Sequence, residues 1–185
     1  MKDISISYNK YKFLGNEFLT WLWYLIENDI NIKKMVESEL EKAGVECNSI
    51  VFEIGNCIAL ENSLGDESVE KISIKGDDAG LEEGKTALKK GAVVTDMNLV
   101  MHIDDNEWRF NIKGESMEIT SLKTPVAGKV EGEEDTEGAV LEKVFLYNRL
   151  FEIIDILFHN FIKKRVSENW KKVDITTIRE WAEQL

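Results

Sequence analysis

The sequence predicts an α+β fold in which an antiparallel sheet carries helices packed on one face, with a long C-terminal helix. Strand patterns gather in the middle of the chain and helical patterns toward its ends, instead of alternating strictly along it. The longest apolar repeat with a helical period runs from Ala139 to about Val166. Because the chain has 185 residues, 43% of them hydrophobic, we expect a single domain over residues 1–185 with one core.

A first helix is predicted over Leu14–Glu27. Gly15-Asn16 is its expected N-cap, and Glu17 falls in the first turn, where a carboxylate complements the helix dipole. The segment is apolar almost all round, so the helix is either buried or meets a partner protein. The candidate interface residues on it are Phe18, Trp21 and Trp23.

The next segments predict a helix followed by a hairpin. The apolar stripe of Asn31–Ala43 indicates a helix that Gly44 ends. Two apolar runs, Ser49–Ile54 and Cys57–Glu61, are separated by Gly55-Asn56, which is typical of a tight hairpin turn. We therefore expect two paired strands here.

The middle of the chain completes the predicted sheet. A strand over Val69–Lys75 extends it, and a short helix over Leu81–Lys90 connects it to the next strands. Strands over Val93–Ile103 and Glu107–Ile112 bracket an acidic turn at residues 104–106. Met117–Leu122 adds a further strand.

The C-terminal third is predicted to be helical after one loop. Residues 129–138 are acidic, contain glycine and lack periodicity, which indicates an exposed loop. The long helix follows from Ala139. A last helix over Thr176–Glu183 has Asp174 as its expected N-cap.

Net charge sets a limit on nucleic-acid binding. The formal net charge is −12, which repels nucleic acid unless the basic residues gather on one face. Several basic clusters could form such a phosphate-tracking stripe, although those at helix ends also stabilise the helix dipole. The candidate DNA-binding residues are Lys33, Lys34, Lys89, Lys90, Lys163, Lys164 and Arg165.

The sequence offers no readable catalytic or metal site. A metal site would need His102 and His159 to converge with a carboxylate, although His102 is expected on the solvent face of its strand and His159 at the polar edge of its helix. Cys47 and Cys57 lack metal-ligand spacing and are expected to be buried free thiols. Glycine-rich phosphate loops are missing from the sequence. We therefore predict no catalytic residues, no metal and no cofactor.

Location follows from what the sequence lacks at its N-terminus. Met1-Lys2-Asp3 is not followed by a secretory signal pattern, and the apolar window Phe18–Ile26 is too short to span a bilayer. We expect a cytoplasmic protein with no membrane partner.

Three segments resemble the recombination-associated RdgC family. Residues 13–23, FLGNEFLTWLW, resemble the family signature F-L-G-x-E-F-L-T-W-L-W. Residues 90–95, KGAVVT, resemble the family's K-x-G-x-x-V-T before a strand, and residues 131–135, EGEED, resemble its acidic loop before a long terminal helix. The resemblance covers almost the whole chain and corresponds to the C-terminal half of a family member.

The resemblance implies a function. Members of the family form ring-shaped dimers that bind DNA with little sequence preference and restrain recombinases. By resemblance, the chain is expected to modulate recombination through non-specific DNA binding as an oligomer, on the nucleoid, as a homodimer or with a second protein subunit. The strongly acidic charge favours an alternative, a non-catalytic protein-interaction or scaffold subunit that has lost DNA binding. Abundant carboxylates motivate a lesser alternative, a metal-dependent nuclease.

Overall fold

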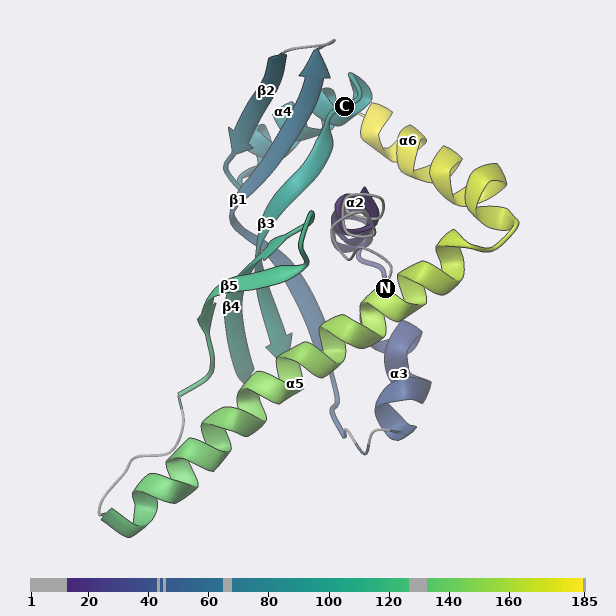
Figure 1. The fold of residues 1–185 in the computed structure, drawn as a ribbon. Helices are drawn as coiled ribbons and strands as arrows, with labels where there is room; N and C mark the ends of the chain where they lie inside the picture. Colours follow the sequence, from purple (N-terminus) through teal and green to yellow (C-terminus); the bar gives the residue numbers. More distant parts are fainter. Residues whose placement is uncertain (1–12, 43, 45, 65–67, 127–132, 185) are drawn as a thin grey trace, which may run out of the picture.

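The five strands form one antiparallel sheet, and the helices pack against it (Figure 1). The computed structural model describes residues 13–42, 44, 46–64, 68–126 and 133–184. The strand order is β2-β1-β3-β4-β5. The strands are β1 (Ile50–Leu64), β2 (Ser68–Ile74), β3 (Val93–Ile103), β4 (Asn106–Lys113) and β5 (Glu118–Lys123). The predicted α+β class is confirmed.

The helices and one π-helical turn account for most of the remaining described residues. They are α2 (Phe13–Glu27), α3 (Ile32–Lys42), α4 (Asp78–Lys89), α5 (Glu133–Arg165), η1 (Trp170–Asp174) and α6 (Ile175–Glu183). Helix α2 lies between the sheet and the C-terminal helices α5 and α6 (Figure 1). It is therefore covered on both sides.

Strand β1 is continuous, so the predicted hairpin at Gly55-Asn56 is wrong. Its pairing with β3 shifts register between Ile54 and Ile58, which marks a bulge instead of a turn. The side chain of Asn98 fills the space beside Gly55, and its Oδ1 accepts a hydrogen bond from the Asn56 backbone N–H at 3.0 Å. A long-range contact thus overrides the local turn signal.

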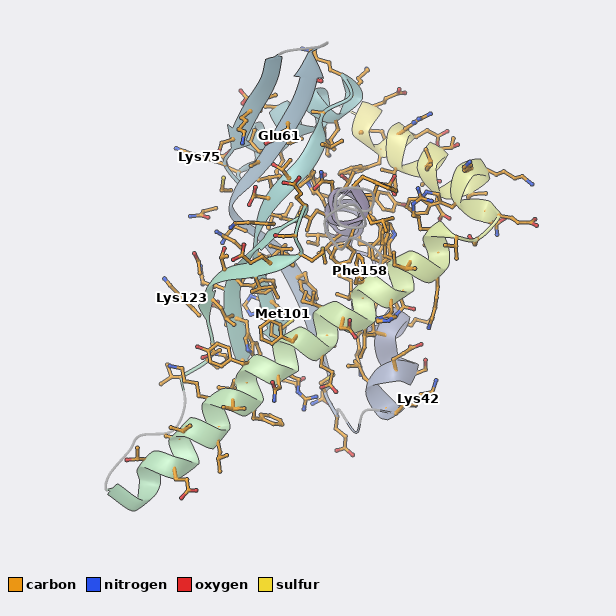
Figure 2. The ribbon with its side chains drawn as sticks, in the orientation of Figure 1. Lys42, Glu61, Lys75, Met101, Lys123 and Phe158 are labelled. Carbon is orange, nitrogen blue, oxygen red and sulfur yellow. The ribbon has the colours of Figure 1, made fainter. Side chains whose placement is uncertain are left out.

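Alternating residues of β3 and β4 build the sheet side of the core. Met97, Leu99 and Met101 of β3 are buried, as are Phe110 and Ile112 of β4. The intervening side chains lie on the face that the helices leave open and are polar, except for the buried Val100 of β3. Lys75 and Lys123 point away from the helices (Figure 2).

Helix α2 is the centre of the core, which corrects the expected interface role of its aromatic residues. Phe18, Trp21 and Trp23 are each at most 1% exposed. Phe18 and Trp21 both lie against the ring of Phe161 in α5, and Trp23 meets Trp181 of α6 edge-on at 5.4 Å. Phe158 lies at the same junction of α5 with α2 (Figure 2).

Helix α2 begins at Phe13, so Gly15-Asn16 is not its N-cap. Gly15 lies inside the helix against the turn between β4 and β5, where any β-carbon would overlap the carbonyl oxygen of Gly114. Glycine is required here because the two backbones touch. Glu17 is likewise inside the helix and forms an ion pair with Arg165.

Helix α5 starts at Glu133, inside the segment predicted as a loop. The part of residues 129–138 before Glu133 lies outside the described residues. Residues 136–138 are exposed, so this turn of the helix packs against nothing and needs no apolar face. The absence of an apolar repeat in these residues therefore did not indicate a loop. Farther along, Trp108 Nε1 of β4 donates to the Leu146 carbonyl oxygen at 3.0 Å and anchors α5 on the sheet.

The end of the chain turns back along α2. Trp170 of η1 and Trp181 of α6 are buried, which fixes this segment against the core. Asp174 was predicted to cap α6, but its side chain makes no capping hydrogen bond. It forms an ion pair with Lys164 at 2.8 Å instead. The other boundaries fall within a few residues of the predicted ones.

Candidate functional site

An open, mostly apolar groove of about 400 Å³ lies where α2, the end of α4, the start of β3 and α6 meet. Helix α2 supplies one wall, and the link from α4 into β3 supplies another. The turn η1 and helix α6 close the third side. The lining residues are Phe13, Asn16, Glu17, Thr20, Leu88, Ala92, Val93, Trp170, Ile175, Ile178, Arg179 and Ala182.

The fold brings two separate sequence segments together at this groove. Residues 13–23 contribute their outward face, since the inward face of α2 is in the core. Residues 90–95 contribute Ala92 and Val93. These are two of the three segments that carry the resemblance in the sequence, and the packing of α4 and β3 places one beside the other. The groove is therefore our candidate functional site.

Cationic side chains stand at the rim. Arg165 Nε donates to Glu17 Oε2 at 2.6 Å, and its guanidinium lies 5.7 Å from the centre of the Phe13 ring. Arg179 lines the groove from α6. Lys89 and Lys90 are exposed at the end of α4, just before the lining residues of β3. Within the described ranges these two lysines and Arg179 have no ion-pair partner.

One polar atom at the groove lacks a partner. Asn16 Oδ1 is buried and accepts no hydrogen bond from the described part of the chain, while the Asn16 carbonyl oxygen accepts from Thr20 Oγ1 at 3.0 Å. The side chain is wedged beside Gly114, which has no β-carbon to exclude it. Asn16 and Thr20 are therefore the polar residues by which α2 lines the groove beside Glu17.

The other predicted DNA-binding residues are dispersed and mostly paired with acids. Lys33 lies 3.9 Å from Glu37 on its own helix. Lys163 pairs with Glu39 at 3.4 Å, joining α5 to α3. Lys164 is held by Asp174, as described above. Lys34 is exposed on α3 and away from the groove. Only Lys89, Lys90 and Arg165 of the predicted set lie near the groove.

The histidines and cysteines do not converge. His102 is half-buried on β3, 3.7 Å from Glu53, and His159 is exposed on α5, 3.4 Å from Asp155. Within the described residues, no three His, Cys, Asp or Glu side chains are placed to hold a metal ion. Cys47 is free and half-buried. Cys57 is also free and half-buried, with its sulfur 3.1 Å from Ser73 Oγ, so both thiols are free but the prediction that they are buried is wrong.

Sequence reasoning missed Arg179 and Thr20 as groove residues. Arg179 comes from the last helix, and nothing local in its sequence indicates that it faces α2. Thr20 was visible only as part of an apolar helix. The outward positions 13, 16, 17 and 20 of α2 do follow a helical spacing, and that spacing was the available signal.

Sequence and structure comparisons add no relative. No protein-family model, no curated protein and no solved structure matches this chain. In the part of the chain that the structure describes, none of the helices is both long and apolar enough to span a bilayer.

Proposed function

We propose that this chain is a non-catalytic, RdgC-like DNA-associated protein that modulates recombination through sequence-independent DNA binding and acts as an oligomer. The observation that supports it is the convergence at one groove of two of the three segments that resemble the family, residues 13–23 and 90–95. A cationic rim beside a half-exposed aromatic ring is the chemistry that tracks a phosphate backbone and stacks on bases.

Each rim residue has a part in this proposal. Lys89, Lys90 and Arg179 contact phosphates, because they are not committed to acids among the described residues. Arg165 is held against Glu17 and orients Phe13, whose side chain is 43% exposed and offers a ring face to a base. None of these contacts reads a base edge, so the binding has little sequence preference.

The net charge of −12 makes the binding weak and dependent on salt. The field of the whole chain opposes DNA, and only the local rim attracts it. Each phosphate that a lysine or arginine neutralises contributes about −0.9 to the slope of log K against log salt. Two lysines that contact phosphates therefore account for a slope of about −2.

The test is fluorescence anisotropy with single- and double-stranded DNA over a salt series. We expect Lys89→Gln/Lys90→Gln to weaken binding and to reduce the salt slope by about two. The control is Lys42→Gln/Lys123→Gln, which makes the same change in net charge on α3 and β5, away from the groove (Figure 2). If both pairs weaken binding equally, the groove is not the DNA site.

The pairing of most candidate basic residues favours a second function, that of a protein-interaction subunit. Lys33, Lys163, Lys164 and Arg165 are all neutralised by acids within the chain. Such a subunit binds no DNA even at low salt while the protein is folded. Absence of binding in the anisotropy experiment, with a normal thermal transition, favours this second function.

A further inference from the structure

The first part of α5 projects from the body of the protein and is apolar on its outer side. In Figure 1 this end of the helix extends past the edge of the sheet. The first buried residue of the helix among its described side chains is Leu146. Before and beyond it, large apolar side chains are exposed at helical spacing. They are Val140, Leu141, Val144, Phe145 and Phe151, here called the α5 stripe.

The α5 stripe lies opposite the face of α5 that packs on the core. Leu146, Leu150, Ile153 and Leu157 form the buried face. At 100° per residue, Leu141, Val144 and Phe145 fall on the other side of the helix. Leu141 is 64% exposed and Phe145 57% exposed. A helix that is apolar on two faces is expected to have a partner on each.

We infer that the α5 stripe is a homodimer interface in which two copies pack their α5 helices antiparallel about a twofold axis. The inference rests on the oligomeric part of the proposed function and adds the surface and the geometry. A single helical stripe is self-complementary under a twofold axis, so one surface serves both copies. The residues that are exposed in one copy are then buried against the same residues of the other copy.

The exposed area suits a second copy. The α5 stripe offers on the order of 500 Å² of apolar surface, since one fully exposed aromatic side chain presents about 150–250 Å². Two copies therefore bury up to about 1,000 Å² from the stripe alone, which is the lower limit for a specific interface. A patch of about 500 Å² is the size of the largest apolar patch on a typical monomer, and such patches often mark an interaction site.

Local charge also permits self-association at this place. Two copies of a chain with a net charge of −12 repel each other over most of their surface. Residues 138–151 contain one acid, Glu142, and two bases, Lys143 and Arg149, so this segment carries a local charge of +1. The four acids at residues 133–137 lie outside this segment, and an antiparallel arrangement keeps them about 30 Å from the same acids of the other copy.

The first test is the molar mass of the full chain by light scattering over a concentration series. We expect a dimer for the wild type and a monomer for Leu141→Glu/Phe145→Glu, whose exposed sites leave the fold intact by circular dichroism. The control Val126→Glu/Val166→Glu adds the same charge at exposed apolar positions outside the α5 stripe and stays dimeric. A monomeric wild type, or a stripe variant that remains dimeric, overturns the inference.

Cross-linking tests the antiparallel geometry, with Cys47 and Cys57 replaced by serine. Asn148 lies near the middle of the stripe, so Asn148→Cys is expected to cross-link between copies through a short thiol reagent. Thr136→Cys is not, because two antiparallel copies hold it about 30 Å apart at a rise of about 1.5 Å per residue. Cross-linking at Thr136→Cys overturns the antiparallel arrangement. Molar mass and cross-linking are both measured without DNA. A failure of the proposed DNA binding therefore leaves the test of the dimer interface unchanged.

Discussion

Replacing Gly15 by alanine tests the close contact that positions α2 under the groove. A β-carbon at this position would overlap the carbonyl oxygen of Gly114 and lie 2.8 Å from its carbonyl carbon. Carbon atoms in contact prefer about 3.5–4.0 Å, so the helix and the β4–β5 turn must separate by at least about 0.7 Å. Both neighbours are backbone, and neither can move like a flexible side chain.

The expected cost follows from two opposing effects. Overpacking of this kind costs about 1–3 kcal/mol and sometimes more. Alanine in a helix recovers about 1 kcal/mol relative to glycine. Because the clash is with backbone, the overpacking cost lies at the upper end of its range, and we expect Gly15→Ala to lower the free energy of unfolding by about 2 kcal/mol net, or the melting temperature by about 4–8 °C.

Thermal and urea unfolding followed by circular dichroism measure this cost, and Gly138→Ala is the matched control. Gly138 is also inside a helix, but a β-carbon there meets no heavy atom within 4 Å. The same substitution is expected to leave stability unchanged or to raise it by up to about 1 kcal/mol. If Gly15→Ala is as stable as Gly138→Ala, the close approach of α2 to the β4–β5 turn is wrong.

Two further predictions concern titratable groups. Partial burial raises the pKa of Asp96, because its ionised form is less favourable in the fold than in the unfolded chain. Protonated Asp96 therefore adds to the stability of the fold below the pKa of the unfolded chain. This contribution is lost as the pH rises through the pKa of the folded state. Asp96→Asn should raise the melting temperature at neutral pH and change little in acid, and an equal effect at both pH values contradicts this. Burial also raises the pKa of the Cys47 thiol, so a Cys57→Ser variant should react with iodoacetamide more slowly than a free cysteine at neutral pH, approaching its rate only in alkali. A rate equal to that of free cysteine at neutral pH contradicts the burial effect.

The sheet and the long helices were predictable because their patterns are local and repeated. Strand β3 has the predicted bounds Val93–Ile103 because buried and polar side chains alternate along most of it. The Gly55-Asn56 prediction failed because the partner that decides between a turn and a bulge, Asn98, is distant in sequence. Local turn chemistry gives the options, and the contact across the sheet selects one.

The groove could be predicted only in part. The outward face of α2 and the segment after α4 are visible in the sequence, but their meeting depends on the way α4 and β3 pack. The aromatic residues of α2 left two possibilities, core or interface, and composition could not separate them. Phe161 and Trp181, which cover them, lie at the other end of the chain.

That separation has a consequence for biosynthesis. Helix α2 leaves the ribosome well before the residues that pack on it, Phe158, Phe161 and Trp181, which come far later in the sequence. At about 5–20 residues per second, the nascent chain exposes an aromatic helix to water for several seconds before the residues that bury it are synthesised. A stalled or truncated chain that lacks α5 and α6 is therefore expected to be a chaperone client or to aggregate.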